Sequence, residues 1–445
     1  MKLTILGGGG FRVPLVFSAL LEDVNACGIT EIWLYDVNRA RVEVIAAVLQ
    51  QAAHSAERSV PRVVVADSLY EALVEADFVF SAIRVGGVYG RTVDERVAME
   101  AGLLGQETVG AGGIAFGLRT VPEVVRLAER IAELAPAAWV VNFTNPAGLL
   151  TEAMQTILGA RVIGICDSPS GLCRRAALAV GADPDTARFD YAGLNHLGWL
   201  RVLEVEGVDR LPGLLADDEA LQTFTEGRLF GPAWLRALGS IPNEYLHYYY
   251  FQREAIASAA AAGATRGEFL QSQQDGFYLA ASRDPSAAFE DWQRVRAERD
   301  ASYMAETRTE ADERDDADLA AGGYEVVALG LMRALAGGPP ATLILNVANG
   351  ETFGCLDPRA VIEVPCEVDA DGPSPLRVAP LSDHQAGLMC SVKAVERSVI
   401  EAATTGSRVA AVRAFALHPL VDSVVVAEHL LDAYVARLPE LAYLG

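Results

Sequence analysis

One cysteine and one histidine stand in local contexts that could bind a metal ion. Cys166 directly follows a short apolar run, Val162 to Ile165, and His196 comes thirty residues later in a Gly-Leu-Asn-His stretch. A thiolate and a neutral imidazole are suitable ligands for a borderline divalent metal. Two protein ligands cannot close a structural zinc site, so substrate oxygens could occupy the open positions. Taken alone, a single cysteine and a single histidine are more often buried core residues.

A tyrosine in an aromatic run is the candidate for acid–base chemistry. The run extends from Tyr245 to Phe251, and for most of it core packing is the simpler interpretation. Tyrosine can act as a general base only if its pKa of about 10 is lowered, which a neighbouring metal or cation can do. We assign that role to Tyr245.

Three further polar residues are candidates for holding a ligand. Asn145 follows the predicted strand Trp139 to Phe143, and ligands bind at the carboxyl ends of strands in open α/β sheets. The alternative is that Asn145 and Pro146 only form a turn. Arg91 and Arg266 could form a phosphate clamp, because a guanidinium group matches phosphate bidentately. Without other context, surface salt bridges are the simpler interpretation of both arginines.

A glycine-rich turn predicts a nucleotide site. Gly7, Gly8, Gly9 and Gly10 follow the predicted strand Lys2 to Leu6 and precede a helix, where backbone N–H groups can approach a pyrophosphate. Val13 replaces the third glycine of the usual fingerprint, so a flexible turn is the alternative. Asp36 ends the next predicted strand, Glu31 to Tyr35, where a carboxylate can bind ribose hydroxyls and repel a 2′-phosphate. This pattern favours NAD over NADP.

Composition excludes several classes of partner. The 445 residues include 36 Lys and Arg against 59 Asp and Glu, a formal net charge of -23, which repels nucleic acids and anionic membranes. An anionic substrate must therefore be held by individual arginines. No apolar run approaches the roughly 20 residues of a membrane span, and the N-terminus is predicted to be a strand, so we expect a cytoplasmic protein. Six scattered cysteines do not suggest a disulfide framework.

The elements that must position these residues divide into two predicted domains. Residues 1–195 alternate β-branched runs with amphipathic stretches, which predicts an α/β, Rossmann-type doubly wound parallel sheet, similar to lactate and malate dehydrogenases. The six predicted strands of this domain are Lys2 to Leu6, Glu31 to Tyr35, Arg62 to Ala66, Phe78 to Ile83, Trp139 to Phe143 and Val162 to Ile165.

Residues 196–445 are predicted to form an α+β domain for substrate, metal and self-association. We expect strands at His196 to Glu204, Ala341 to Val347 and Ala360 to Glu367, and a helix at Asn243 to Gly263. The charged segment from Arg283 to Gly322 predicts a solvated helix or a mobile excursion.

Taken together in this order, these stretches resemble glycoside hydrolase family 4, a group of NAD-dependent glycosidases. The resemblance covers nearly the whole chain. Besides the glycine turn and Asn145, the stretches that carry it are Ile83 to Gly87, Gly105 to Thr108, Gly110 to Gly113, Cys166 to Pro169, Gly193 to His196, Asn243 to Leu246, Asn349 to Gly350 and Val364 to Cys366.

The resemblance implies a 6-phospho-glucosidase that uses NAD and a divalent metal, usually Mn²⁺. NAD takes a hydride from C3 of the sugar, a base removes the C2 proton, the aglycone leaves, water adds and the hydride returns, without net redox change. It implies the following roles: Cys166 and His196 as metal ligands, Tyr245 as the C2 base, Asp167 assisting the leaving group, Arg91, Asn145 and Arg266 holding the sugar and its 6-phosphate, and Gly7 to Gly10, Phe11, Asp36 and Ile83 binding NAD. It also implies a homodimer or homotetramer.

The chain departs from the family pattern in two places. Gly10 to Pro14 reads Gly-Phe-Arg-Val-Pro, where most relatives have Ser, an aromatic residue, Thr and Pro. Asp167 resembles relatives that act on α-glucosides, but Ser168 fits neither anomeric group, so the anomer stays open. The absence of His after Cys166 favours a phosphorylated substrate. A lactate- or malate-type 2-hydroxyacid dehydrogenase and a non-catalytic NAD-binding sensor are the alternatives.

Overall fold

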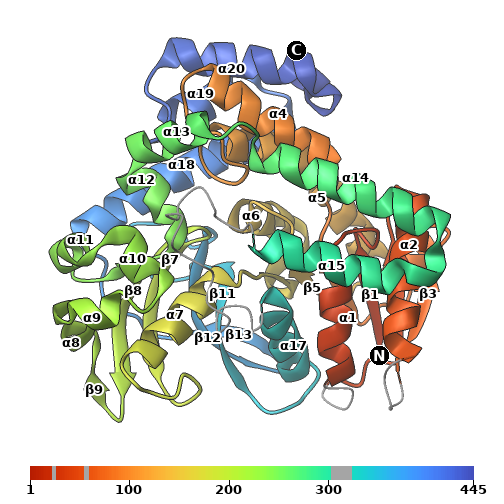
Figure 1. Ribbon diagram of the computed structural model, residues 1–445, viewed down its shortest axis with the longest axis horizontal. Helices are drawn as coiled ribbons and strands as arrows, with labels where there is room; N and C mark the ends of the chain where they lie inside the picture. The colour runs from red at the N-terminus through yellow and green to blue at the C-terminus, as the bar shows by residue number, and fades with distance from the viewer. Residues whose placement is uncertain (23–26, 55–59, 302–322) are drawn as a thin grey trace.

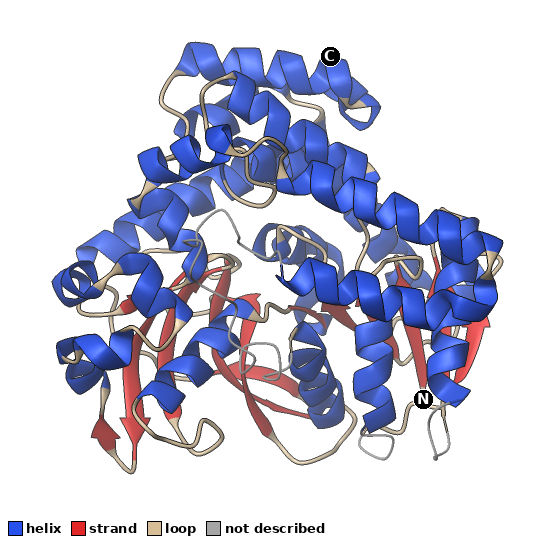
Figure 2. Cartoon of the chain, in the orientation of Figure 1, coloured by secondary structure: helices blue, strands red, loops and turns tan. Residues whose placement is uncertain are grey.

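A single sheet organises the molecule. The structure is a computed structural model that describes residues 1–22, 27–54, 60–301 and 323–445. Within them, thirteen strands pair in the order β10-β8-β7-β12-β11-β6-β5-β4-β1-β2-β3, with β13 beside β12 and β9 beside β8. Figure 2 shows the strands inside and the helices around them. No helix of the described part is both long and apolar enough to cross a membrane.

The parallel half of the sheet comes from the first 164 residues. Its strands are β1 (Lys2–Leu6), β2 (Glu31–Tyr35), β3 (Arg62–Val65), β4 (Phe78–Ser81), β5 (Trp139–Asn142) and β6 (Val162–Gly164). Their order, β3-β2-β1-β4-β5-β6, is that of a dinucleotide-binding fold, which binds ligands where the order reverses, between β1 and β4. The Rossmann-type prediction is confirmed, and strand ends differ from prediction by at most two residues.

Helices connect the parallel strands. They are α1 (Val13–Glu22), α2 (Arg39–His54), α3 (Leu69–Leu73), α4 (Gly87–Glu100), α5 (Gly110–Leu134), α6 (Ala147–Leu158), the short 3-10 turn η1 (Gly159–Arg161), and α7 (Ser168–Ala179). Each of α1, α6 and α7 begins within a few residues of the end of a parallel strand. The segments between strand and helix therefore lie together at one edge of the sheet, where the candidate residues are found.

The antiparallel half continues the same sheet beyond β6. Its strands are β7 (Arg188–Leu194), β8 (Leu197–Val205), β9 (Val208–Asp209), β10 (Ile241–Pro242), β11 (Ala341–Ala348), β12 (Val361–Asp369) and β13 (Gly372–Pro375). The three strands predicted in this half correspond to β8, β11 and β12. β11 joins the two halves, because Asn346 pairs with Gly164 of β6. The predicted domain boundary at residue 195 falls in the two-residue turn between β7 and β8, and the division into two domains stays a prediction.

The remaining helices surround this half and return to the first. They are α8 (Leu211–Ala216), α9 (Asp218–Leu221), α10 (Thr225–Phe230), α11 (Pro232–Leu238), η2 (Glu244–Leu246), α12 (His247–Tyr250), α13 (Gln252–Ala261), α14 (Arg266–Arg283), η3 (Pro285–Ala287), α15 (Ala288–Ala301), α17 (Tyr324–Leu335), α18 (Asp383–Thr405), α19 (Arg408–Leu417), α20 (Val424–Arg437) and η5 (Pro439–Leu444). Figure 1 shows α14 running from α4 toward α2 in front of the parallel half, with α15 beside it and in contact with α2.

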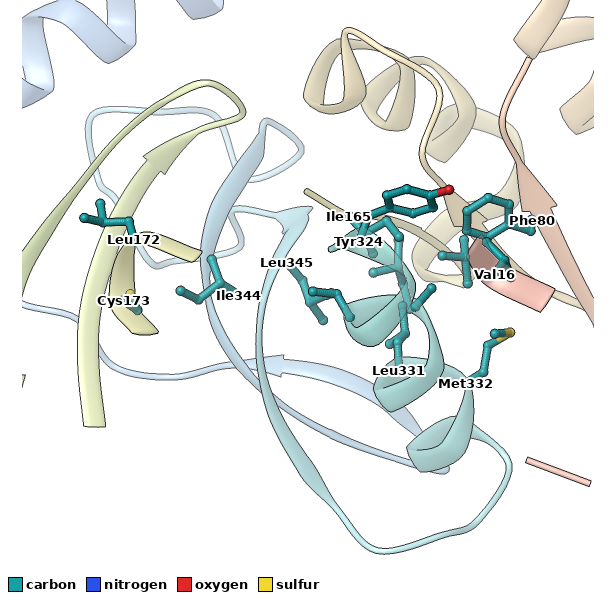
Figure 3. Packing of buried hydrophobic residues seen from close by; sticks show 14 of the residues in the cluster. Val16, Phe80, Ile165, Leu172, Cys173, Tyr324, Leu331, Met332, Ile344 and Leu345 are labelled. Atoms are coloured by element: carbon teal, nitrogen blue, oxygen red, sulfur yellow. The ribbon is translucent and has the colours of Figure 1, made fainter. Parts of the chain in front are cut away.

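The hydrophobic core is continuous across both halves. One buried cluster contains Leu3 of β1 and Val364 of β12, each without exposed surface. Figure 3 shows part of it, in which Leu331 of α17 lies near Leu345 of β11 and Tyr324 lies near Phe80 of β4. Burying this apolar surface stabilises the register between the halves, and that register determines how side chains of the second half face the parallel strands.

Two predictions for the second half need correction. The segment expected to be one helix over Asn243 to Gly263 forms η2, α12 and α13. Asn243 caps its start by accepting a hydrogen bond from Tyr245 N at 3.0 Å, and the helix breaks at Phe251, whose backbone (φ -125°, ψ 42°) leaves the helical region. In the charged segment, a helix is present as one of the two alternatives predicted, but α15 (Ala288–Ala301) is not solvated on all sides. Its Trp292 is 2% exposed and donates through Nε1 to Phe11 O at 2.8 Å. Residues 302–322 lie outside the described residues.

Candidate active site

A cavity of about 1280 Å³ lies at the carboxyl ends of the parallel strands. The strand-end segments that follow β1, β2, β4, β5 and β6 all contribute to its lining. The predicted site residues among its lining are Gly7, Gly9, Gly10, Phe11, Asp36, Ile83, Arg91, Asn145, Cys166, Asp167, His196, Tyr245 and Arg266. Gly8 is the exception: it packs underneath, where an added Cβ would lie 2.9 Å from Leu34 Cβ.

The glycine turn forms one end of the cavity, the nucleotide end. Gly7 has φ of +82°, and a Cβ there would lie 2.4 Å from Ala82 O, so only glycine fits. The N–H groups of Gly7 and Gly8 donate to Tyr35 O at 3.0 and 2.9 Å. Asp36 accepts from Gly9 N at 3.2 Å through Oδ2 and from Asn38 N at 2.9 Å through Oδ1. The carboxylate is thus held beside the turn, where a ribose could meet it.

Side chains of α14 and α15 hold the turn that contains Gly9 and Phe11. Phe11 is 5% exposed and packs edge-on against Phe277 of α14 at a centroid distance of 5.3 Å. Its carbonyl accepts from Trp292 of α15. Tyr278 of α14 donates to Gly9 O at 2.6 Å. Helices α14 and α15 therefore fix the backbone of a turn that is distant from them in sequence.

The ends of β4 and β5 are joined by hydrogen bonds of Thr144. Its Oγ1 accepts from Ile83 N at 3.0 Å and lies 3.0 Å from Ser81 Oγ. Beyond it, the Asn145–Pro146 peptide bond is cis. Asn145 donates to Phe143 O at 3.3 Å, but its buried Oδ1 has no hydrogen-bond partner among the described residues. A buried acceptor at a cavity wall fits a ligand that supplies a hydroxyl donor.

Cys166 and His196 form the opposite end of the cavity, the metal end, together with Tyr245. Cys166 is 6% and His196 5% exposed. His196 is in the left-handed region (φ +62°) within the β7–β8 turn, its Nδ1 lies 3.0 Å from Thr108 Oγ1, and its ring stacks on Tyr245 at a centroid distance of 3.7 Å. The contact with Thr108 leaves Nε2 as the nitrogen suited to bind a metal.

The protonation states of this pair are consistent with a metal site. Burial lowers the pKa of His196 to about 4, despite the carboxylates of Asp167 and Glu107, so the imidazole is neutral as a ligand requires. Burial raises the pKa of the Cys166 thiol well above its ordinary value, and Glu363 and Asp167 add to the effect. A bound divalent cation would favour the thiolate. Within the described residues, no group of three or more His, Cys, Asp and Glu side chains could hold a metal, so coordination positions would stay open.

Arginines and carboxylates alternate on the wall between the two ends. Arg91 donates to Glu95 Oε1 at 2.8 Å and to Glu107 Oε1 at 2.7 Å, and Arg84 donates to Glu107 Oε2 at 2.8 Å. Burial would raise the pKa of Glu107, but Arg84 and Arg91 outweigh it and lower that pKa to about 2. Arg266 begins α14 and donates to Arg299 O at 3.0 Å. This wall therefore has several guanidinium groups and a carboxylate that stays ionised.

Two family models match the chain. The model described as "Family 4 glycosyl hydrolase" matches residues 2–181, and "Family 4 glycosyl hydrolase C-terminal domain" matches residues 191–421. The chain belongs to family 4 of the glycosyl hydrolases.

Proteins similar to this family 4 glycosyl hydrolase include enzymes of both anomeric types. It is 29% identical to the probable 6-phospho-beta-glucosidase of Bacillus subtilis, over 99% of this chain and 98% of that one. It is 28% identical to 6-phospho-alpha-glucosidase 1 of Lacticaseibacillus paracasei, over 98% and 96%. The 6-phospho-beta glucosidase of Thermotoga maritima, solved with NAD and glucose-6-phosphate, matches with a TM-score of 0.82 and 26% identity over 99% of both chains.

The expected likeness to dehydrogenases holds at the level of the fold. A lactate dehydrogenase from a Medee basin deep-sea metagenome library matches with a TM-score of 0.52 at 13% identity, over 91% of this chain and 98% of that one. This likeness confirms the lactate and malate dehydrogenase-like fold of the family 4 glycosyl hydrolase.

Several residues of the cavity received no role from the sequence. Glu107 and Thr108 lie in a stretch that carries the family resemblance, so they were visible as a motif, but their contacts with Arg91 and His196 depend on the fold. Arg12 was noted only as a departure from the family pattern. Arg299 lies at the end of α15, where burial and nearby Arg12, Arg91 and Arg266 lower its pKa to about 9. No sequence signal distinguished Arg299 from the other charges of its segment.

Proposed function

We propose that this family 4 glycosyl hydrolase cleaves 6-phospho-glucosides with NAD and a divalent metal, Mn²⁺, as cofactors. One observation carries the proposal: a single cavity is lined by the glycine turn with Asp36, by Cys166 with His196, and by Tyr245. A simple dehydrogenase has no need for the Cys166 and His196 pair. The Thermotoga maritima 6-phospho-beta glucosidase was solved with manganese, NAD+ and glucose-6-phosphate, which is the combination of ligands proposed here.

The binding roles follow from the two ends of the cavity. We assign NAD to Gly7, Gly8, Gly9, Gly10, Phe11, Asp36 and Ile83, and the metal to Cys166 and His196. Gly8 supports the turn from below and does not line the cavity. When bound, NAD supplies a hydride acceptor and the metal a positive charge beside the sugar oxygens. The neutral imidazole of His196 and the unpartnered Oδ1 of Asn145 among the described residues support ligands at these positions.

The side chains of the metal end hold the sugar and move its proton. Tyr245 removes the C2 proton: its ring lies against His196, and its phenol is close enough to Arg91 for their charges to interact. A nearby guanidinium stabilises a phenolate. Asp167, the N-cap residue of α7, assists departure of the aglycone. Asn145 orients the sugar hydroxyls, while Arg91 and Arg266 hold the 6-phosphate.

The test is release of p-nitrophenol from the α- and β-linked p-nitrophenyl glucoside 6-phosphates, with and without NAD and Mn²⁺. We expect release that needs both cofactors, without accumulation of NADH, and with deuterium at C2 of the product when the reaction runs in D₂O. The same glucosides without phosphate serve as control. Stoichiometric NADH would support the dehydrogenase alternative instead, and cofactor binding without any turnover would support the sensor alternative.

We also propose that the protein is a cytoplasmic homodimer or homotetramer. The support is apolar surface on the last helices, where Val409, Val424 and Val425 are 78%, 59% and 58% exposed. If these side chains form one continuous patch, such a patch is typical of a protein contact. Light scattering after gel filtration measures the oligomeric state, and a monomer at micromolar concentration would contradict it.

A further inference from the structure

A buried carboxyl group lies behind the metal end, and among the described residues its hydrogen bonds come from neutral donors. Glu363, in the middle of β12, has no exposed surface. It accepts hydrogen bonds from Asn346 Nδ2 at 2.9 Å, Tyr191 OH at 3.3 Å and Asn195 Nδ2 at 3.4 Å. Burying a carboxyl group costs free energy that neutral donors offset only in part. A leucine at this strand position would pack with less cost, so the position of this carboxyl group calls for an explanation.

One donor to Glu363, Asn195, lies in the turn that carries His196. Asn195 is the first residue of the β7–β8 turn and precedes His196. Its Oδ1 accepts from Ala147 N at 3.1 Å, two residues after Asn145. Because Oδ1 is used in this way, the Nδ2 end of the amide faces Glu363. One amide side chain therefore connects three parts of the fold: β12, the segment after β5, and the turn with His196.

A second donor to Glu363, Asn346, lies beside the end of β6, which leads to Cys166. Asn346 pairs with Gly164, two residues before Cys166. The approach is close, because a Cβ on Gly164 would lie 2.8 Å from Asn346 Cβ. Asn346 Nδ2 donates to the same carboxyl oxygen, Oε1, as Asn195 Nδ2. Glu363 Oε1 is thus the common acceptor for Asn346, on the strand beside the one that leads to Cys166, and for Asn195, in the turn that contains His196.

The conformation of the turn makes such an anchor useful. His196 has φ of +62°, which a non-glycine residue adopts at a cost of roughly 1 kcal/mol. Its ring must also meet Thr108 and Tyr245, which come from other segments. A turn with a strained residue keeps one orientation only when its surroundings determine it. Asn195, held at both ends of its amide, provides that constraint.

We propose that Glu363 is a positioning residue, whose Oε1 holds Asn195 and thereby sets the orientation of His196 relative to Cys166 and Asn145. The inference rests on the proposed function and extends it to a residue that touches neither substrate nor cofactor. Outer partners of metal ligands typically contribute about 10- to 100-fold to metal affinity or activity. Glu363 acts through hydrogen-bond acceptance, so glutamine, which retains an acceptor oxygen, should replace it.

The test compares Glu363→Leu, Glu363→Gln and the control Tyr191→Phe. Tyr191 donates to the other carboxyl oxygen, Oε2, so its hydroxyl does not bond to the oxygen that holds Asn195. Mn²⁺ binding is measured from the electron paramagnetic resonance signal of free Mn²⁺, NAD binding from protein fluorescence, and folding from thermal melting. We expect Glu363→Leu to weaken Mn²⁺ binding by about 10- to 100-fold with NAD binding unchanged. Glu363→Gln and Tyr191→Phe should stay close to wild type.

A double-mutant cycle of Asn195→Ala with Glu363→Leu tests the route. If Glu363 acts through Asn195, then Asn195→Ala alone weakens Mn²⁺ binding, and adding Glu363→Leu changes it no further. If the Glu363→Leu chain does not fold, Asn195→Ala alone decides: Mn²⁺ binding like that of wild type would overturn the proposal. Additive losses in the double variant would overturn the proposal, as would a Glu363→Leu chain that melts earlier but binds Mn²⁺ like wild type. A wild-type chain that neither binds Mn²⁺ nor cleaves a 6-phospho-glucoside contradicts the proposed function itself, and this inference with it.

Discussion

The nucleotide end and the metal end of the cavity are built in different ways. At the nucleotide end, the glycine turn and Asp36 lie within thirty residues of each other, and their contacts are largely backbone N–H groups. At the metal end, Cys166, His196 and Tyr245 come from separate segments and meet through side chains. Local backbone geometry forms the first, and α14 and α15 pack against it, whereas the second depends on the register between the two halves of the sheet. Substitutions at the metal end should therefore lower the rate of the reaction, and substitutions at the nucleotide end should lower the affinity for NAD.

The largest effect should come from Tyr245→Phe. If Tyr245 is the base, removal of its hydroxyl lowers kcat by about 10²- to 10⁴-fold, the usual contribution of a positioned general base. NAD affinity should not change, because the ring still packs on His196. Steady-state kinetics on the active p-nitrophenyl glucoside 6-phosphate and fluorescence titration with NAD measure the two effects.

Tyr250→Phe is the matched control for this prediction. Tyr250 belongs to the same aromatic run but bonds to Trp199 and His384 outside the cavity lining. Its variant should keep kcat near wild type. Equal losses in the two variants would mean that the aromatic run acts through packing, and Tyr245 would no longer be the base.

The second prediction concerns the charges between the two ends. The pKa of Glu107 is lowered to about 2 because Arg84 and Arg91 outweigh burial. Its ionised form therefore contributes stability above the ordinary pKa of about 4.5, and this contribution is lost as pH falls toward 2. The shift corresponds to about 3 kcal/mol.

Urea unfolding measures this contribution. The free energies of unfolding of wild type and Glu107→Gln should differ by about that amount at pH 7 and converge as pH falls from 4.5 to 2.5. A difference that is constant with pH would show that Glu107 contributes by packing. The backbone donors of the nucleotide end do not titrate and add no such slope.

The same contrast explains what could be predicted from the sequence. The parallel strands, the glycine turn and Asp36 were predicted because each signal is local: an apolar run, a turn composition, a carboxylate at a strand end. The broken helix before Gly263 was missed because the break depends on one residue, Phe251, whose backbone leaves the helical region.

At the metal end, the family resemblance supplied residue identities but no contacts. The stacking of His196 on Tyr245 joins residues 49 positions apart in the sequence. The convergence of Asn195 and Asn346 on Glu363 depends on strand pairing between β6, β11, β12 and β7. The packing of α15 on the glycine turn relies on few inward side chains, such as Trp292. So few apolar positions among the many charges of α15 form a pattern too weak to detect in the sequence. Long-range register, rather than composition, decides these contacts.

The third prediction separates phosphate recognition from the rest of the metal end. Charge-assisted hydrogen bonds to phosphate contribute about 1.5–3 kcal/mol, so Arg266→Gln should lower kcat/KM for a 6-phospho-glucoside by about 10- to 100-fold. The residual rate on the unphosphorylated glucoside should not change. Arg283→Gln, at the exposed end of the same helix α14, is the control and should leave both rates intact. Equal losses on both substrates would mean that Arg266 supports α14 and does not contact the phosphate.

The smallest effect should appear at the nucleotide end. Asp36→Asn keeps an acceptor for a ribose hydroxyl but removes the charge, which reduces the hydrogen bond by about 1 kcal/mol and NAD affinity by about fivefold. The amide no longer repels a 2′-phosphate, so the preference for NAD over NADP should fall while kcat at saturating NAD stays the same. Paired titrations with NAD and NADP measure this. Gly9 N and Asn38 N bond to different oxygens of the carboxylate, so the amide oxygen can keep only one of these two bonds, and loss of the other adds to the weaker NAD binding. A loss of kcat in this variant would show that the two ends of the cavity are coupled. The nucleotide end would then affect the reaction itself and not only the affinity for NAD, which contradicts the contrast drawn between the two ends.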